Sequence, residues 1–328
     1  MLTKISAAAI LAMLSGLATA QAFDLQGHRG ARGLAPENTL EGFATALALG
    51  VSTLELDLAV TSDGVVVVSH DRVLNPDHTR DASGKFLEAP GPALRALTFA
   101  QLQQYDVGRL KPGTEYAARF AEQRPVDGAR IPALKDVFGL VAQRGANWIR
   151  FNIETKLTPT SGAETPDPES FAKAVAAVVK EAGLSARVSV QSFDWRTLVA
   201  MQRIAPEIER VCLTIETPEE DNIQRGKAGP SPWTAGFDID DLGGVTPLLV
   251  KAAGCAVWSP FFRNVTPELL AQAKSAGIKT IPWTVNEPAD MARLIDLGVE
   301  GIISDYPDRL RNVLAAKGMA LPQPVPAR

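Results

Sequence analysis

The chain alternates short apolar segments with amphipathic helical segments along most of its length, and this alternation limits the folds open to it. The apolar segments are predicted to be strands at 24–28, 53–60, 147–155, 187–193, 209–215, 255–260, 279–285 and 301–305. Helical spacing of apolar residues occurs near 38–49, 133–144, 168–182, 194–204, 245–253, 266–276, 288–297 and 307–316. This count of strand–helix units predicts an α/β fold, a (β/α)8 barrel of the TIM type. A doubly wound sheet is the competing architecture, but no G-x-G-x-x-G turn follows any of these strands.

One stretch of the chain interrupts the alternation. A turn signal at 61–64 precedes V-V-V-V, so 57–70 is predicted to be a hairpin that extends the second barrel strand. The following residues, about 72–130, are dense in Pro, Gly, Asp and Arg and are predicted to form an insertion after strand two. Loops that follow barrel strands gather at the catalytic end of the barrel, so we expect the insertion to cap the site.

The two ends of the chain are predicted to lie outside the barrel of residues 23–321. Lys4, the apolar run 5–17 and small residues at 18–22 are typical of a secretory signal, so residues 1–22 are predicted to direct export to a periplasm or to the outside. That apolar run is too short to span a bilayer, and no stable membrane insertion is expected. The Pro-rich tail 322–328 is predicted to be disordered.

The net charge limits the binding partners to be expected, and the positions of the cysteines bear on whether they are bonded. The net charge of −4 gives no electrostatic reason to expect nucleic acid or an anionic membrane as partner, so any phosphate recognition must be local. Nothing in the sequence indicates the oligomeric state. Cys212 and Cys255 lie in apolar strand-like runs, which favours two free buried thiols, although export would permit a disulfide.

Two pairs of charged residues suggest a cation site. Glu55 and Asp57 lie two apart on one strand, so both side chains project to the same face, where two carboxylates repel each other unless a cation or protons neutralise them. Glu154-x-Lys156 repeats this spacing on the third barrel strand, and Glu154 could complete a three-carboxylate site for Mg²⁺ or Ca²⁺. The alternatives are a solvated strand end, carboxylates matched to a lysine, and a local ion pair.

Three histidines could move protons. His28 ends the first strand and precedes Arg29, whose planar guanidinium matches phosphate oxygens, although a lone histidine is more often structural. His70 ends the hairpin beside Asp71, which could orient it or solvate the turn. His78 lies in the polar run N-P-D-H-T-R and is predicted to be a surface residue.

Further polar and aromatic residues stand at strand ends or helix starts. Asn38 or Thr39 can cap the first helix, and Glu37 could reach the site from the same loop. Trp283 is predicted to pack against the carbon skeleton of a small substrate, and Gln191 to supply an amide to the pocket. Phe193 is interpreted as ordinary barrel packing, Asp305 closes the last strand without an assigned role, and Trp233 is placed on the Gly/Pro-rich loop 226–236.

Two classes of active site are argued against by what the chain lacks. No G-x-S-x-G is present, so acyl transfer through a serine elbow is disfavoured. Three histidines cannot build a His-rich zinc site and leave one free for proton transfer.

The motifs together resemble the glycerophosphodiester phosphodiesterase family. H-R-G-A-R-G-L-A-P-E-N-T-L-E-G-F, L-E-L-D-L-A-V-T-S-D-G-V-V-V-V-S-H-D, F-N-I-E-T-K, V-Q-S-F, P-W-T-V-N and G-I-I-S-D-Y-P look like its successive blocks, in order, over nearly the whole chain after the signal. The resemblance implies a TIM-like barrel with a small insertion after strand two. It also implies hydrolysis of glycerophosphodiesters to sn-glycerol 3-phosphate and an alcohol.

The resemblance also assigns roles to individual residues. It implies that His28 and His70 are the acid/base pair, and that Glu55, Asp57 and Glu154 hold one divalent cation, Ca²⁺ or Mg²⁺. Arg29 and Lys156 match the family's phosphate contacts, and Trp283 matches its tryptophan.

Several points stay open at this stage. The nucleophile is water or a neighbouring glycerol hydroxyl acting through a cyclic phosphate, and neither the head group nor the native cation can be read. A phospholipase or lysophospholipase D on the same barrel, a non-catalytic exported glycerophosphate-binding protein and, more distantly, a glycosidase are the alternatives.

Overall fold

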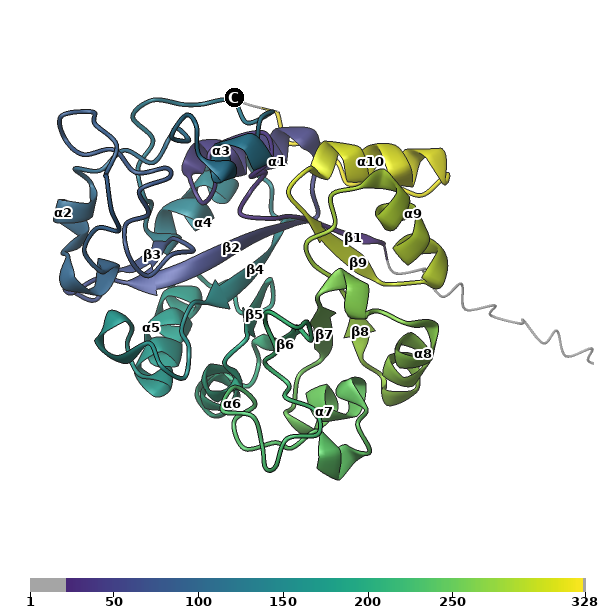
Figure 1. Cartoon of the computed structure of the whole chain (residues 1–328). Helices are drawn as coiled ribbons and strands as arrows, with labels where there is room; N and C mark the ends of the chain where they lie inside the picture. Colours follow the sequence, from purple (N-terminus) through teal and green to yellow (C-terminus); the bar gives the residue numbers. More distant parts are fainter. Residues whose placement is uncertain (1–21, 327–328) are drawn as a thin grey trace, which may run out of the picture.

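Eight parallel strands form a nearly closed sheet in the computed structural model, which describes residues 22–326 (Figure 1). The strand order β8-β7-β6-β5-β4-β2-β1-β9 follows the chain without a switch point, which confirms the TIM-like barrel and excludes a doubly wound sheet. The ring is completed by backbone bonds from Glu300 N to Thr280 O (3.1 Å) and from Ile303 N to Pro282 O (3.0 Å). The parallel strands are β1 Asp24–Gly27, β2 Thr53–Val60, β4 Arg150–Thr155, β5 Val188–Ser192, β6 Glu209–Thr214, β7 Val257–Pro260, β8 Lys279–Thr280 and β9 Gly301–Ser304.

Helices surround this sheet on the outside (Figure 1). They pack on the strands because each has an apolar face, and the largest buried cluster of the molecule lies between the two layers. Every helix predicted from the sequence is present within two residues of its expected bounds. The helices of the barrel are α1 Leu40–Leu49, α4 Leu134–Gln143, α5 Pro168–Glu181, α6 Trp195–Ile204, α7 Thr246–Ala252, α8 Pro267–Ala276, α9 Pro288–Leu297 and α10 Pro307–Ala316.

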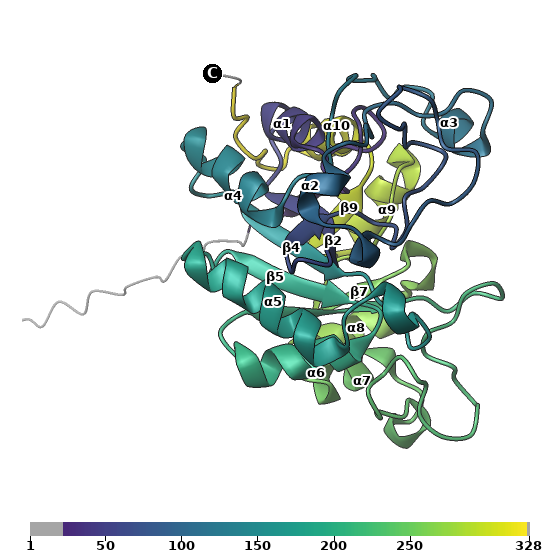
Figure 2. The ribbon, with the colours of Figure 1, turned by 90° about the vertical axis from the view of Figure 1, so that its left-hand side faces the viewer.

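The insertion after β2 begins as the predicted hairpin. Strand β3, Val66–Val68, pairs antiparallel with β2, and the chain then continues through η1 Leu94–Ala96, α2 Phe99–Leu102 and α3 Glu115–Arg119. These short elements have their own small buried cluster, which includes Leu74, Leu94 and Leu102. Figure 2 shows the insertion and the loop between β6 and α7 at the same end of the barrel, where the parallel strands end. Further one-turn helices, η2 Gly162–Glu164, η3 Asp240–Leu242 and η4 Phe262–Asn264, lie in the connecting loops.

Cys212 and Cys255 form a disulfide, so the prediction of two free thiols is wrong. Cys212 lies in β6 and Cys255 lies just before β7, its neighbour in the sheet, which brings their Cα atoms to 5.9 Å. That separation is within the usual range for bridged cysteines. The sequence separation of 43 hides this proximity from a reading of the sequence.

The two ends of the chain differ in how the structure treats them. The signal predicted at 1–22 lies, apart from its last residue, outside the described residues. The tail predicted to be disordered is instead packed as far as the structure follows it, to residue 326. Val325 is 3% exposed and donates its amide to Leu47 O (2.8 Å), while Arg311 NH1 donates to Pro322 O (2.7 Å). Buried apolar contact and an arginine bridge therefore hold 322–326 against α1 and α10.

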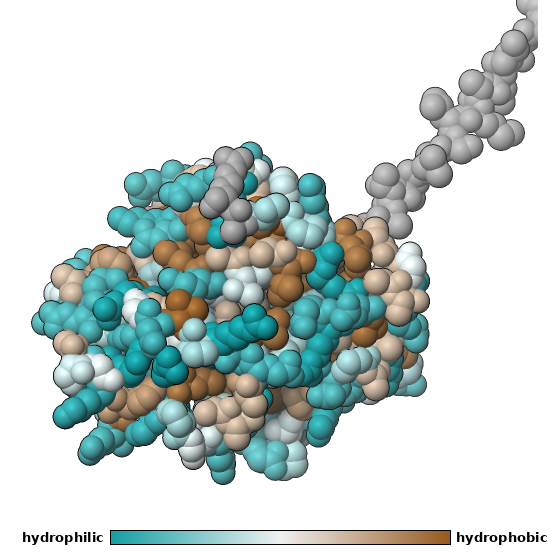
Figure 3. All heavy atoms as spheres, turned by 90° about the horizontal axis from the view of Figure 1, so that it is seen from above, coloured by the Kyte–Doolittle hydropathy of each residue, from teal (hydrophilic) through white to brown (hydrophobic). Residues whose placement is uncertain are grey.

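The helices and the surface can be compared with what a membrane protein requires. No helix between residues 22 and 326 combines the length and the apolar character that a membrane span requires. Seen from the side of α1 and α10, hydrophilic and hydrophobic residues are interspersed over the surface (Figure 3).

Candidate active site

A tight turn between β1 and α1 presents His28 and Arg29 at the strand end. A Cβ on Gly27 would overlap the carbonyl oxygen of Gly30, and Gly30 itself has φ +88°, so both positions require glycine. Arg29 also has a left-handed backbone, with φ 50°. Its amide donates to Glu55 Oε2 at 2.8 Å, so the strained turn is fixed by a carboxylate of the neighbouring strand.

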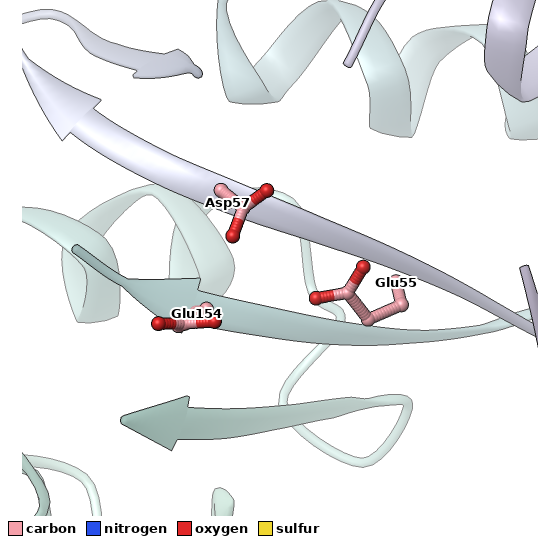
Figure 4. Close-up of side chains that lie close together, drawn as sticks. All are labelled: Glu55, Asp57 and Glu154. Atoms are coloured by element: carbon pink, nitrogen blue, oxygen red, sulfur yellow. The ribbon is translucent and has the colours of Figure 1, made fainter. Parts of the chain in front are cut away.

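Three carboxylates converge beside this turn (Figure 4). Glu55 and Asp57 project from β2, and Glu154 projects from β4, where it is the register partner of Asp57. One oxygen of each lies within 4.8 Å of the others, and all three side chains are buried. The structure thus brings together the three residues that the sequence predicted as cation ligands, and burial excludes the alternative of a solvated strand end.

Each carboxylate is held in place by a polar neighbour. Gln191 Nε2 donates to Glu55 Oε1 (2.8 Å), and Asn38 Nδ2 donates to Asp57 Oδ2 (2.9 Å). These bonds orient the oxygens without neutralising them. Asp57 Oδ1 is buried and has no hydrogen-bond partner among the described residues, which is costly for an ionised oxygen in this setting.

Lys156 supplies part of the positive charge that would balance the three carboxylates. Its Nζ donates to Glu154 Oε1 at 2.7 Å and lies 3.8 Å from Asp57 Oδ1. A lysine match, one of the alternatives raised by the sequence, is therefore present, but a single ammonium faces a group of three carboxylates.

The pKa shifts show that this compensation is incomplete. Burial, with the charge of Asp57 next in size, raises the pKa of Glu55 well above its usual range. Burial likewise raises the pKa of Glu154 to about 7, although Lys156 opposes the shift. Asp57 differs: burial would raise its pKa, but the charges of Arg29, His70 and Lys156 together outweigh burial and hold the pKa well below the usual range. Two carboxyls that resist ionisation beside a third that is ionised indicate room for more positive charge.

The donor set fits a hard divalent cation. The ligand atoms are all carboxylate oxygens, which Ca²⁺ and Mg²⁺ prefer, and no histidine or cysteine belongs to the cluster. Three carboxylates cannot complete the oxygen shell of either ion, so substrate or water oxygens would supply the remainder. Glu55, Asp57 and Glu154 therefore form a site where one such cation would fit.

His28 is anchored by a buried aspartate. Its Nδ1 lies 2.6 Å from Asp305 Oδ1, and its Nε2 lies 3.9 Å from Glu55 Oε2. Arg32 holds the same aspartate from the other side, with Nε 2.8 Å from Oδ1. Burial, and then the charge of Arg32, lower the pKa of His28 to about 4 against the raising effect of Asp305. At neutral pH the ring is thus neutral, with its Nδ1 proton directed at the carboxylate and Nε2 free to accept a proton.

His70 is anchored by an aspartate in the same way. Its Nδ1 lies 2.9 Å from Asp71 Oδ1, and 31% of its side chain is exposed. Burial within the site, with the cations of Arg29 and Lys156 next, lowers the pKa of His70 to about 4. The two histidines therefore have the same protonation state and the same kind of carboxylate anchor.

The two predicted phosphate contacts, Arg29 and Lys156, both contact carboxylates of the site. Arg29 NH1 donates to Glu37 Oε1 (2.7 Å), which confirms that Glu37 reaches the site. Its Nε lies 3.3 Å from Asp57 Oδ2 but makes no hydrogen bond with the described residues, so the guanidinium keeps donors for a ligand. Lys156 lies on the wall of the adjacent cavity.

A cavity of about 930 Å³ opens from the catalytic groups toward the loops. His70, Glu154 and Lys156 line one part of it, and aromatic side chains line another. Trp283 lies on this wall as predicted. Phe193, interpreted from the sequence as ordinary packing, also faces the cavity, where its ring meets that of Trp283 edge to face at 5.2 Å between centroids. Trp233 contributes from the loop after β6.

Two other residues differ from their predicted places. Gln191 does not line the cavity, because its amide is occupied by Glu55 and by Asn152, whose Nδ2 donates to Gln191 Oε1 at 2.8 Å. His78 is not a surface residue: its side chain is 12% exposed and lies against the Asp71 carboxylate. The ring of His78 borders a small cavity together with Glu37, Val107 and Ile131, which are distant in the chain, so the local polar sequence does not reveal this environment.

Several residues of the site carried little signal in the sequence. Asp305 follows β9, the strand beside β1, so only barrel closure brings it to His28. Asn38 was considered only as a helix cap, yet Thr39 caps α1 and Asn38 binds Asp57. Its φ of 54° is a left-handed conformation that asparagine tolerates. The one hint in the sequence was that Asn38 stands directly before Thr39, which can cap the helix by itself and so leaves Asn38 free for another role.

Comparison with known proteins agrees with this geometry. The chain is 29% identical over 291 residues to a glycerophosphodiester phosphodiesterase of Caldanaerobacter subterraneus subsp. tengcongensis, covering 89% of this chain and 97% of that protein. A crystal structure of a Silicibacter pomeroyi protein assigned as a glycerophosphoryl diester phosphodiesterase is 35% identical, with TM-score 0.81 and coverage of 92% and 95%. An Oleispira antarctica phosphodiesterase solved with the product sn-glycerol-3-phosphate shares the fold, at 22% identity, TM-score 0.63 and coverage of 88% and 96%.

The family comparison covers the whole catalytic end of the barrel. The model of the glycerophosphoryl diester phosphodiesterase family matches residues 28–309, a span that begins at His28 and includes both histidines, the three carboxylates and Asp305. Sequence, fold and site thus agree: the chain belongs to the glycerophosphoryl diester phosphodiesterase family and is a phosphoric diester hydrolase.

Proposed function

We propose that this chain hydrolyses glycerophosphodiesters to sn-glycerol 3-phosphate and an alcohol, using His28 and His70 as acid and base. The observation that carries the proposal is the presence of three buried carboxylates together with two neutral histidines, each of which is anchored by an aspartate. Water adds across one P–O bond, so that the glycerol keeps the phosphate and the alcohol leaves with a proton.

We propose that one Ca²⁺ or Mg²⁺ ion belongs to this site, held by Glu55, Asp57 and Glu154. When bound there, such an ion would offset negative charge on the phosphoryl group. The unpaired Asp57 Oδ1 and the raised pKa of Glu55 and of Glu154 support this assignment, because each reports negative charge that the protein alone does not balance.

The remaining roles follow from position. Lys156, on the cavity wall, and the free donors of Arg29 hold phosphate oxygens. Trp283 and Phe193 pack against the carbon skeleton of the substrate. Gln191 acts on Glu55, which it orients, and not on the substrate.

The two histidines can be told apart by the leaving group. Each contributes roughly 10²–10⁴-fold as a general acid or base, so His28→Ala and His70→Ala should both nearly abolish hydrolysis of glycerophosphodiesters with alkyl alcohols while the protein stays folded. A p-nitrophenyl phosphodiester releases p-nitrophenolate, which leaves without being protonated. This substrate should therefore restore turnover in the variant that lacks the general acid and not in the variant that lacks the general base.

Product analysis decides between the proposed activity and its alternatives. Glycerol 3-phosphate should appear in step with the alcohol when a panel of glycerophosphodiesters is incubated with the protein. Near-normal activity in either histidine variant would contradict the assignment of acid and base. Release of glycerol with a phosphorylated alcohol would contradict the direction of cleavage.

We also propose that the protein is exported. The predicted signal at 1–22 and the Cys212–Cys255 disulfide support this, since disulfides persist in oxidising compartments. N-terminal sequencing of the protein recovered from a bacterial periplasm or medium should find a first residue of Gln21 or Phe23. A protein that keeps its first residues and stays in the cytoplasm would refute export.

A further inference from the structure

His78 is a buried histidine for which the proposed reaction has no use. Its side chain is 12% exposed, and both ring nitrogens are buried without a hydrogen-bond partner in the described part of the chain. Burying polar nitrogens in this way costs stability, so a role beyond packing is to be sought in what surrounds the ring.

The carboxylate of Asp71 lies between His78 and His70. Its Oδ1 is 2.9 Å from His70 Nδ1, and its Oδ2 is 3.6 Å from His78 Nε2. The longer distance is that of an ion pair rather than of a hydrogen bond. Asn75 Nδ2 also donates to Oδ2, at 2.7 Å. Asp71 therefore contacts His78 and Asn75 through Oδ2 and holds His70 through Oδ1.

The charges around His78 favour its cationic form. Burial would lower the pKa of His78, but Asp71 and Glu37 together outweigh burial and the charge of Arg29, and the net shift is upward. The other ring nearby is that of Tyr116, 6.0 Å away between centroids. Burial would raise the pKa of Asp71, but the contacts with His70 and then with His78 outweigh it, so the pKa of Asp71 lies well below its usual range.

Packing alone does not fix the ring of His70. A cavity of about 20 Å³ lies between His70 and His78 and is bordered also by Asn75 and Thr79. His70 therefore has open space on this side as well as on the side of the large cavity. Its orientation depends on the bond to Asp71 more than on contact with neighbours.

We propose that His78 is a positioning residue for catalysis: it anchors the Asp71 carboxylate, which holds His70 with its proton on Nδ1 and leaves Nε2 for the substrate. The role rests on the proposed function, in which His70 transfers a proton. In this proposal His78 affects catalysis through Asp71, although it neither contacts the substrate nor belongs to the cation site.

A double-mutant cycle tests whether His78 acts through Asp71. His78→Leu should lower kcat by roughly 10- to 100-fold and change KM less than about twofold, because a small misplacement of a catalytic group costs about this much. Asp71→Asn should cost at least as much. The double variant should be no slower than Asp71→Asn alone, whereas independent effects would multiply. Thr79→Val is the matched control, since it alters the same small cavity without facing Asp71, and it should keep kcat within about twofold.

The tautomer of His70 gives a readout that does not depend on activity. The chain has three histidines, so ¹⁵N spectra of protein labelled at histidine resolve each ring. Wild type should show His70 protonated at Nδ1, and His78→Leu should shift it toward the Nε2–H form. His78→Gln, which keeps an N–H donor at similar reach, replaces the leucine variant if that one does not fold, and it should show a smaller shift in the same direction.

The outcomes separate the two claims. Unchanged kcat and an unchanged His70 tautomer in both His78 variants, or a double variant slowed by the product of the single effects, would overturn the positioning role. If the His78 variants change the His70 tautomer as expected but the wild-type protein hydrolyses no glycerophosphodiester, the proposed function alone is overturned.

Discussion

Asp305→Asn should damage stability and catalysis together, because one buried carboxylate holds both an arginine and His28, the histidine proposed to act in catalysis. Asp305 is 1% exposed and accepts from His28 Nδ1 (2.6 Å), Arg32 Nε (2.8 Å), Arg32 NH2 (3.1 Å) and Asn286 Nδ2 (2.7 Å). An asparagine has the same shape but offers one acceptor oxygen, and its own N–H₂ must then face one of these donors.

The expected loss of stability is large for a change that preserves shape. Removing one partner of a buried ion pair leaves Arg32 uncompensated, which costs about 3–5 kcal/mol in the free energy of unfolding. For kcat we expect a loss of roughly 10²–10⁴-fold, the contribution of one general acid or base, since His28 is no longer held with its proton on Nδ1.

The stability difference should also depend on pH with a definite sign. Although burial would raise it, the charges of Arg32 and His28 hold the pKa of Asp305 well below its usual value. A group whose pKa is depressed by folding stabilises the protein above its unfolded pKa of about 3.9 and loses that effect as the pH falls through the folded value. The advantage of wild type over Asp305→Asn should therefore be complete at pH 7 and shrink below about pH 4.

Urea unfolding between pH 7 and pH 3, combined with kcat at pH 7, measures both effects. Asp194→Asn is the control: Asp194 is a fully buried carboxylate paired with Arg196 at the end of β5, outside the site. It should lose stability and keep kcat within about twofold. An Asp305→Asn protein within about 1 kcal/mol of wild type at pH 7, or one with kcat within about threefold, would refute the reasoning.

Three further predictions address the cation, the disulfide and the cavity. Excess Ca²⁺ or Mg²⁺ should raise the Tm of wild type, because binding at 100 times Kd adds about 2.7 kcal/mol to the free energy of unfolding. Glu154→Gln should lose most of that rise in Tm, and an equal rise in both proteins would contradict the ligand assignment. Cys212→Ser should cost about 3–4 kcal/mol of unfolding free energy, as expected for a bridge across 43 residues, and dithiothreitol should lower the Tm of wild type but not of the variant. Trp283→Ala should raise KM roughly tenfold and change kcat less, and steady-state kinetics showing the reverse would remove Trp283 from substrate binding.

Much of the fold was predictable because its elements are local. Short apolar segments and helical patterns located the strands and helices, and the count of units indicated the barrel. The cluster of the three proposed cation ligands was predictable for a related reason. The i, i+2 spacing of Glu55 and Asp57 fixes a common face, and the ends of parallel strands meet at one rim, where Glu154 joins them.

The remainder depends on contacts between segments far apart in the chain. Nothing near Asp305 announces a histidine 277 residues away, and nothing near Cys212 announces Cys255. His78 was misplaced because its polar run lies within the insertion, and the neighbours that enclose the ring come from segments distant in the chain. Gln191 was assigned to the correct rim but the wrong partner, since the period of a strand gives the direction of a side chain and not the group it meets.

The most direct test of the account is glycerol 3-phosphate release from one glycerophosphodiester by protein stripped with EDTA and then titrated with Ca²⁺ or Mg²⁺. The account predicts negligible release by the stripped protein and recovery of activity, with one cation bound per chain, when either the native ion or a substitute that fits the three carboxylates returns. Glu55→Gln, Asp57→Asn and Glu154→Gln should each fail to recover at the same ion concentration. Full glycerol 3-phosphate release after exhaustive stripping would contradict the claim that the buried carboxylates serve to hold a cation for this reaction.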